Sequence, residues 1–252
     1  MGSFSGHDYE FLCRRWSAVA ERMGLRMREL TKAGGYPVYV LENERSLQGI
    51  PGGLYLSAGV HGDECAPVWA LLEWVESQPE VVRSRPVMIF PCLNPSGFCL
   101  NIRRDQDGTD LNRCFEDTTH PLIAVWAAVL EGRRFDRAVN LHEDYDAGGI
   151  YLYELTREVS IGEKLLSGCE SLIARETASQ VDGAEFRAGL LSRSGDLGKV
   201  VEEDLGGGYP EAILLFLRYA QNAYTFETPS EMDLGLRILT HRSFLEKITT
   251  EE

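Results

Sequence analysis

The amino-acid sequence predicts an α/β protein, a three-layer α/β/α sandwich on a mixed, twisted sheet. Two observations support this fold class. Short apolar segments suited to buried strands alternate with longer segments whose apolar residues recur at helical spacing. Several of the apolar segments run into histidine or carboxylate residues, and ligands of such sheets gather at the carboxyl ends of strands. A chain of 252 residues can bury one large core, so we expect a single domain over residues 1–252.

The N-terminal part is expected to form a helix and a hairpin. Apolar side chains recur at helical spacing in residues 8–22, and a glycine follows the last of them. Residues 25–31 and 36–42 are predicted strands, because the Gly34-Gly35 pair between them provides a tight turn.

A strand, a turn and a helix come next. Residues 54–58 are a short apolar strand that runs directly into a turn at His61. Residues 67–75 continue as a helix with its large apolar side chains on one side, and residues 86–92 form another buried strand. This order is the crossover unit of a parallel sheet.

The same alternation continues to the end of the chain. Pro229 fits the first turn of the last helix. The run Gly206 to Gly208 is expected to be a loop inside the domain, since no linker or repeat is present. The remaining expected helices are 120–131, 157–179, 212–219 and 229–248, and the remaining strands are 138–141, 150–155 and 223–227.

Charge and composition exclude several classes of partner. The net charge of -14 and the pI of about 4.9 argue against binding to nucleic acid or to anionic membranes. No apolar run approaches the roughly 18 residues of a membrane span, and the N-terminus lacks the basic and apolar regions of a signal peptide. The six cysteines form no C-x-x-C pair, as expected for free thiols in the cytoplasm.

Three residues are candidate metal ligands. His61 and Glu64 follow a strand and open a helix, and Gly62 keeps the turn between them narrow. His142 ends another apolar strand, and neighbouring strand ends of a parallel sheet converge. Two histidines and one carboxylate leave a zinc position open for water, as in catalytic sites. The alternatives are a surface turn for His61 and Glu64, and a buried structural histidine for His142.

The segment RRDQDGTDLNRCF supplies candidates for substrate recognition. Asp110 would orient His61 through its second ring nitrogen, or else stabilise its own loop. Asn112 and Arg113 would hold a carboxylate. Either Arg103 or Arg104 would stabilise the developing oxyanion, and the other would form a surface ion pair.

Glu227, at the end of a predicted strand, is the candidate general base and acid. It would take a proton from the attacking water and return it to the leaving nitrogen. The alternative is a glutamate at the N-terminus of the following helix.

These segments, over roughly residues 50 to 230, resemble the carboxypeptidase A-like zinc peptidase superfamily, which includes the succinylglutamate desuccinylase and aspartoacylase branch. The short spacings resemble its small bacterial members. The resemblance implies a zinc carboxypeptidase-like catalytic domain with one zinc ion on His61, Glu64 and His142. It adds Tyr209 as a residue that caps the substrate, with an ordinary packed tyrosine as the alternative. Glu143 departs from the small polar residue that digestive members carry after the histidine.

The sequence therefore predicts a zinc-dependent carboxypeptidase that hydrolyses the amide next to a peptide's free carboxylate. A deacylase of N-acyl amino acids, of the desuccinylase and aspartoacylase type, would need the same groups. A third hypothesis is a zinc-binding protein without turnover, which the presence of Glu227 and an arginine pair disfavours. The substrate side chain and the oligomeric state, a homo-oligomer included, stay open.

Overall fold

The computed structural model describes residues 6–181, 184–193, 197–204 and 207–251. Eight strands form one sheet in the order β1-β2-β4-β3-β5-β10-β6-β9, and β7 pairs with β8 apart from it. The strands are β1 Arg26–Ala33, β2 Tyr36–Glu42, β3 Leu54–Ala58, β4 Val87–Phe90, β5 Phe135–Asp144, β6 Tyr151–Thr156, β7 Gln180–Val181, β8 Ala184–Glu185, β9 Leu190–Arg193 and β10 Ala220–Pro229.

The helices connect these strands in the alternating order that the sequence predicts. They are α1 Tyr9–Met23, α2 Glu44–Leu47, α3 Cys65–Ser77, α4 Pro79–Ser84, α5 Pro95–Leu100, η1 Leu111–Arg113, α6 Pro121–Leu130, α7 Gly162–Ser167, α8 Leu197–Asp204, α9 Glu211–Arg218 and α10 Leu234–Thr250.

The four central strands of the sheet are parallel, and the strand on either side of them is antiparallel to its central neighbour. Strands β4, β3, β5 and β10 run in one direction, whereas β2 and β6 run against their neighbours β4 and β10. The carboxyl ends of β3, β5 and β10 therefore lie at one edge of the sheet, which is where polar groups from these strands can meet. The sheet is mixed, so this part of the predicted fold class is confirmed.

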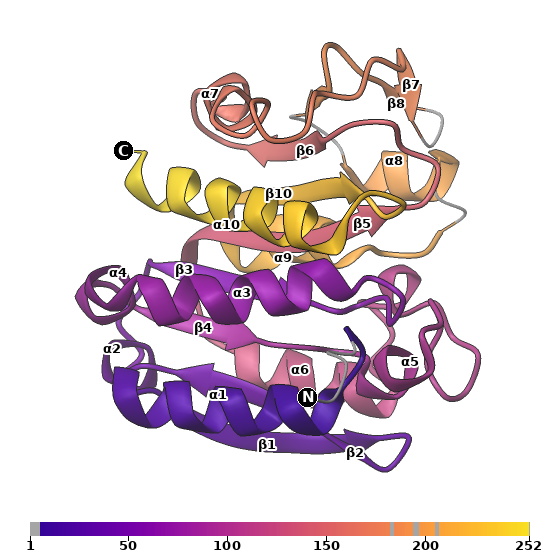
Figure 1. Cartoon of the computed structure of the whole chain (residues 1–252). Helices are drawn as coiled ribbons and strands as arrows, with labels where there is room; N and C mark the ends of the chain where they lie inside the picture. The colour runs from indigo at the N-terminus through magenta and orange to yellow at the C-terminus, as the bar shows by residue number, and fades with distance from the viewer. Residues whose placement is uncertain (1–5, 182–183, 194–196, 205–206, 252) are drawn as a thin grey trace.

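Helices cover both faces of the sheet, which gives the three layers that the sequence predicts. Helices α1, α3 and α10 lie in front of the sheet and α6 and α9 behind it (Figure 1). Residues of β3 are buried on both faces, with Leu54, Leu56 and Ala58 in the front cluster and Tyr55 in the rear one. Such strands lack the polar alternation of one-sided sheets.

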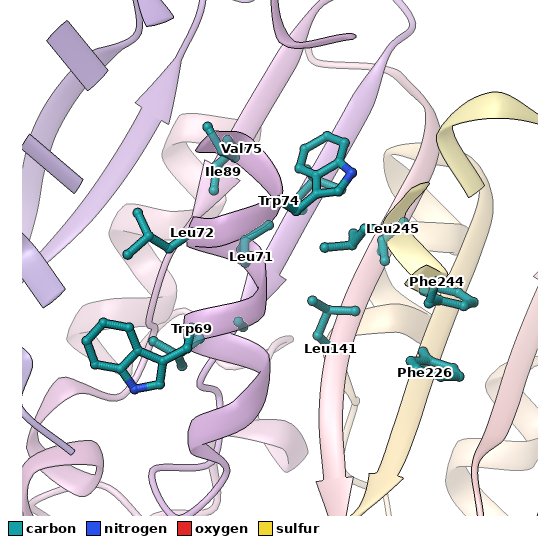
Figure 2. Close-up of a cluster of buried hydrophobic side chains, with 14 of the residues drawn as sticks. Trp69, Leu71, Leu72, Trp74, Val75, Ile89, Leu141, Phe226, Phe244 and Leu245 are labelled. Carbon is teal, nitrogen blue, oxygen red and sulfur yellow. The ribbon is translucent and has the colours of Figure 1, made fainter. Parts of the chain in front are cut away.

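The front core is built mainly by α3 and α10 against β5 and β10 (Figure 2). Trp74 and Leu71 of α3 and Leu245 of α10 belong to the same buried cluster as Leu141 of β5. Phe226 of β10 stacks on Phe244, with ring centroids 4.2 Å apart. This packing fixes α3 to the strands that carry His142 and Glu227.

Two predicted helices differ from the structure. The segment 157–179 is helical only in α7, because residues after it form a β-bridge with Ile150, which precedes β6. The Ile150 N–H donates to the Ala174 carbonyl oxygen, and the Glu176 N–H donates to the Ile150 carbonyl oxygen, at 2.9 and 2.8 Å. Pro229 is the last residue of β10, not the first turn of α10, which the Asp233 side chain caps. Gly206 lies outside the described residues.

All six cysteines are unpaired thiols, as predicted. Within the described ranges, no helix combines the length and the apolar character needed to cross a membrane.

Candidate metal centre and substrate cavity

The turn between β3 and α3 carries the first two candidate ligands. Its Gly62 packs directly on α5, since a Cβ atom at this position would lie 2.0 Å from the carbonyl carbon of Gly97. The Gly62 N–H donates to the Arg103 carbonyl oxygen at 3.3 Å. A side chain at position 62 would push the turn away from α5, so glycine is required by close approach.

His61, Glu64 and His142 converge at the carboxyl ends of β3 and β5. The three side chains are buried, and one ligand atom from each lies within 4.8 Å of the other two. The Glu64 carboxylate lies between the imidazoles, with Oε1 2.5 Å from His61 Nδ1 and Oε2 2.9 Å from His142 Nδ1. The structure thus brings together three residues that the sequence holds far apart.

This set of donors fits a metal ion. Two imidazole nitrogens and a carboxylate are the ligands of catalytic zinc sites, in which a fourth position takes water or substrate. The second ring nitrogen of His61 lies 3.1 Å from Asp110 Oδ1. A carboxylate in that place is the usual partner of a metal-binding histidine, because it fixes the tautomer. The group therefore suggests a bound metal ion.

The charges of the three residues depend on one another. Burial by itself lowers the pKa of His61, but the carboxylates of Glu64 and Asp110 outweigh it and raise that pKa to about 9. Glu64 raises the pKa of His142 against the effect of burial. Burial favours neutral Glu64, but the two imidazoles outweigh it and lower its pKa. A metal ion entering the site must therefore displace protons.

We expect the metal-free protein to lose stability as the pH rises from 6.5 to about 9. Folding raises the pKa of His61, so the protonated imidazole stabilises the folded protein. This stabilisation is complete below the pKa of the unfolded state, and it disappears as the pH rises through the pKa of the folded state. A loss on the order of 2–3 kcal/mol should appear in urea unfolding curves recorded with a chelator at about pH 6 and about pH 9.5. The His61→Asn variant, as control, should show a much smaller loss, and equal losses in both proteins would contradict this origin.

The loop after α5 brings a carboxylate and a guanidinium beside the metal group. Asp110 Oδ2 accepts a hydrogen bond from Arg103 Nε at 3.1 Å, and Arg103 Nη1 lies 4.0 Å from Glu64 Oε1. Arg104 donates to a carbonyl oxygen of its own loop at 2.9 Å and is not part of the cavity lining. Of the two arginines that the sequence left open, Arg103 is the one beside the candidate metal group.

Asn112 and Arg113 lie in η1, which follows Asp110. Asn112 Oδ1 accepts from the backbone N–H of Glu211 at 2.9 Å, so its amide nitrogen is the end left to a ligand. Arg113 Nη1 donates to the Asn112 carbonyl oxygen at 2.9 Å. In the described part of the chain no carboxylate lies within ion-pair distance of Arg113. Both side chains line the cavity, where a guanidinium and an amide suit a carboxylate.

Glu227 lies on β10 opposite His142 of β5 and Tyr151 of β6. Its side chain is half-buried and lines the cavity. Because β10 continues past it to Pro229 and α10 begins only at Leu234, Glu227 is not a residue of a helix N-terminus. The alternative explanation of this glutamate is therefore wrong.

Tyr209 has the contacts of a packed side chain, which is the alternative to a substrate cap that the sequence left open. Its half-buried side chain packs against the rear apolar cluster, and its carbonyl oxygen accepts from the Phe115 N–H at 3.1 Å. It forms a bridge with Cys114 and is not among the residues that line the cavity. These contacts hold it as a packed tyrosine rather than as a cap over a substrate.

A cavity of about 750 Å³ adjoins the candidate groups. Its lining includes His61 and Glu64 of the metal group, Arg103, Arg113 and Glu227. Residues of β6, β9, α8 and α9 line it as well, and these are largely apolar but include a further guanidinium. They are Tyr153, Leu155, Leu191, Arg193, Leu197, Ala212 and Ile213.

Glu143, beside His142, has a role that the sequence did not reveal. It is buried, its Oε2 accepts from the Ala66 N–H at 2.9 Å, and it forms an ion pair with Arg237 of α10. Burial raises its pKa to about 7, although Arg237 acts in the opposite direction. Glu143 thereby holds the first turn of α3, next to Glu64. A strand end followed by acidic residues gives no signal that separates this role from that of a solvated loop.

Comparison with known proteins agrees with this arrangement. Residues 52–146 match the family model of the succinylglutamate desuccinylase/aspartoacylase catalytic domain. The matched segment contains the candidate metal ligands, Asp110 and Arg113, and it ends before Glu227. Among curated proteins, none matches the chain at a significant level.

Solved structures share the fold over nearly the whole chain. A protein assigned to the metallopeptidases from Shewanella amazonensis SB2B has a TM-score of 0.81 at 23% identity, over 96% of this chain and 92% of its own. A similar protein from Shewanella denitrificans OS217 has a TM-score of 0.82 at 19% identity, over 96% and 89%. A metallo-carboxypeptidase from Burkholderia cenocepacia has a TM-score of 0.65 at 16% identity, over 94% and 67%. The zinc carboxypeptidase-like fold that the sequence predicts is confirmed.

Proposed function

Because the chain has the fold of the carboxypeptidase-like superfamily and resembles its desuccinylase and aspartoacylase branch, we propose that it is a zinc-dependent carboxypeptidase. It would hydrolyse the amide bond next to the free carboxylate of a peptide. The observation that carries the proposal is one cavity lined by a buried His-Glu pair, by Arg103 and Arg113, and by Glu227.

The candidate ligands would hold the zinc ion. Zinc when bound supplies a Lewis acid, which polarises the scissile carbonyl and lowers the pKa of a coordinated water. Asp110 fixes the orientation of His61, and Glu143 fixes the helix that begins beside Glu64. Both carboxylates keep the ligands in place before the metal arrives, which reduces the cost of binding it.

The other side chains would act directly on the substrate. Arg113 and the Asn112 amide nitrogen hold the terminal carboxylate and so set which bond is cleaved. Arg103 donates to the carbonyl oxygen as negative charge develops on it. Glu227 accepts a proton from the attacking water and passes it to the leaving nitrogen.

A second candidate function is removal of an acyl group from an N-acyl amino acid. Two observations favour it: the family model over residues 52–146, and Arg193 among the largely apolar residues that also line the cavity. A guanidinium there, in addition to Arg103 and Arg113, would suit a substrate that carries a second anionic group.

A substrate panel separates the two functions. The zinc-loaded protein would be incubated with peptides that have a free or an amidated C-terminus and with N-acetyl, N-succinyl and N-formyl amino acids, and mass spectrometry would identify the products. A carboxypeptidase releases a terminal amino acid from the free peptides alone, whereas a deacylase acts on the N-acyl compounds. No product from any member of the panel would contradict both enzymes and favour a zinc-binding protein without turnover.

We expect Arg113→Ala to raise KM for the accepted substrate roughly 30- to 100-fold and to change kcat less than about threefold. The lost interaction is a charge-assisted hydrogen bond made equally in the ground state and the transition state. Steady-state kinetics would measure both constants. Arg104→Ala is the matched control, because that neighbouring guanidinium does not line the cavity, and it should keep the wild-type KM. An equal rise in both variants would contradict the assignment of Arg113.

A further inference from the structure

A polar cluster lies buried between the sheet and α9, outside the cavity lining. We call Glu211, Tyr55, Ser57, Asn140 and Trp126 the Glu211 cluster. All five side chains are at most 1% exposed. Burying a carboxylate costs free energy unless hydrogen bonds satisfy it, so Glu211 needs hydrogen-bond donors inside the protein.

Hydrogen bonds link the cluster to both central strands. The Tyr55 hydroxyl donates to Glu211 Oε1, and the Ser57 hydroxyl donates to Oε2 at 2.9 Å. Trp126 Nε1 donates to the Tyr55 hydroxyl and Asn140 Nδ2 to the Ser57 hydroxyl, both at 2.8 Å. The first residue of α9 is thereby fastened to β3 and, through it, to β5.

The same strands lead to the candidate metal ligands. β3 ends just before His61, and Asn140 precedes His142 on β5. The backbone of Glu211 contacts one of the two residues that would bind the carboxylate: its N–H donates to Asn112 Oδ1 at 2.9 Å. Glu211 thus connects the strands that lead to the metal group with Asn112.

We propose that Glu211 is a positioning residue, which orients the Asn112 side-chain amide so that its nitrogen faces the carboxylate of the substrate. The inference rests on the proposed function, since it concerns the same carboxylate. An asparagine amide has one acceptor and one donor end. With the acceptor end occupied by the Glu211 N–H, the donor end is set toward the cavity that Asn112 lines.

The carboxylate of Glu211, and not only its backbone, is needed for this role. Pro210 precedes α9 as its N-cap and makes no side-chain capping bond. The bonds from Tyr55 and Ser57 therefore anchor the first turn of α9. Without them two buried hydroxyls lose their acceptor, the first turn can shift, and the Asn112 amide loses its fixed orientation.

The test measures Asn112 and the anion site separately from turnover. In zinc-loaded protein, the Asn112 side-chain NH2 resonance would be assigned by its loss in Asn112→Asp and followed during titration with succinate. We expect Glu211→Ala to shift this resonance in the free protein and to raise the Kd for succinate about tenfold, the effect of one lost hydrogen bond to a charged group. KM should rise by a similar factor while kcat stays within about threefold.

Glu211→Gln is the conservative variant and should restore succinate affinity to within about threefold, because its carbonyl oxygen still accepts from one hydroxyl. Glu42→Ala is the matched control. Glu42 is a buried carboxylate that accepts from Ser46 and Arg133 at the opposite edge of the sheet. The Glu42→Ala variant should have a lower Tm than the wild type, with an unchanged Asn112 resonance and an unchanged Kd for succinate.

Three outcomes would overturn the inference: an unshifted Asn112 resonance in folded Glu211→Ala, an unchanged succinate Kd in that variant, or an equal loss of affinity in Glu42→Ala. If Glu211→Ala does not fold, the double variant Tyr55→Phe/Ser57→Ala keeps the Glu211 side chain and removes the same two hydrogen bonds, together with those that Trp126 and Asn140 donate to the two hydroxyls. The same shifts are expected in it. Failure of the proposed function looks different: Arg113→Ala would then keep full succinate affinity, while the Asn112 resonance would still respond to Glu211.

Discussion

Replacing Glu227 with glutamine is expected to lower kcat about a thousandfold, within the range that general acid–base groups contribute. Glutamine keeps the size and a carbonyl oxygen, but it cannot take a proton from water or return one to a leaving nitrogen. Glu227 lines the cavity and lies opposite His142 in the parallel pairing of β10 with β5. Its substitution should therefore remove proton transfer and leave the candidate metal ligands and Arg113 intact.

The measurement combines kinetics with metal analysis. Glu227→Gln should bind substrate with near wild-type KM and carry one zinc ion per chain by plasma mass spectrometry. Glu231→Gln is the matched control, because Glu231 is another carboxylate that lines the cavity, in the turn after β10. It should keep kcat within about threefold. Near wild-type kcat in Glu227→Gln would exclude Glu227 as the base.

The part of the fold that carries the site was predictable from local sequence. The strand at 54–58 has the bounds that the sequence predicts, because a continuous apolar run after two glycines has no competing local structure. The convergence of His61 with His142 followed from the rule that parallel strand ends meet at one edge. Both inferences need only short-range pattern and topology.

Elements whose structure depends on distant partners were not predictable. Residues after α7 have helical composition, yet they bond to Ile150, which the sequence does not place beside them. Pro229 fits a helix start as well as a strand end, and only the pairing of β10 with β5 decides between them. Propensity is a weak prior, which such tertiary contacts override.

In the candidate site, too, some features were predictable from local sequence and others depend on distant contacts. Residue types that bind metal or carboxylate are visible in the sequence, but their supports are not. Glu143 looks like a loop charge and is buried against Arg237, and Glu211 looks like the exposed start of a helix and is fully buried. Tyr209 has a suitable position in the sequence for a substrate cap, yet its backbone pairs with Cys114 and its ring packs on the core. Orientation is a property of the packed fold and leaves no local signal.

The two roles of acidic residues at this site have separable consequences. Glu64 and Asp110 contact the candidate ligand His61 directly. The other two carboxylates support first turns of helices: Glu143 accepts from a backbone N–H of α3, and Glu211, the first residue of α9, accepts from two hydroxyls of β3. Loss of a direct contact should change metal affinity. Loss of a backbone support should shift the geometry of the cavity and leave the metal donors in place.

Removal of the metal, or of one ligand, should have the second large effect. We expect His142→Ala to lose zinc on dialysis and to lower kcat/KM by at least about a thousandfold, since a Lewis acid contributes several kcal/mol to transition-state stabilisation and each 1.36 kcal/mol is a factor of ten. Dialysis of the wild-type protein against a chelator should give the same loss, and readdition of zinc should restore activity to the wild type but not to His142→Ala.

The control is a histidine outside the metal group. His120 pairs with Asp105, its Nε2 3.0 Å from the carboxylate, and is not part of the cluster formed by His61, Glu64 and His142. His120→Ala should therefore keep one zinc ion per chain even if its folding stability falls. Isothermal titration with zinc at pH 7 would measure the affinity of each protein and the protons released. Equal zinc affinity in His142→Ala and the wild type would remove His142 from the metal site, and with it the basis for a carboxypeptidase mechanism.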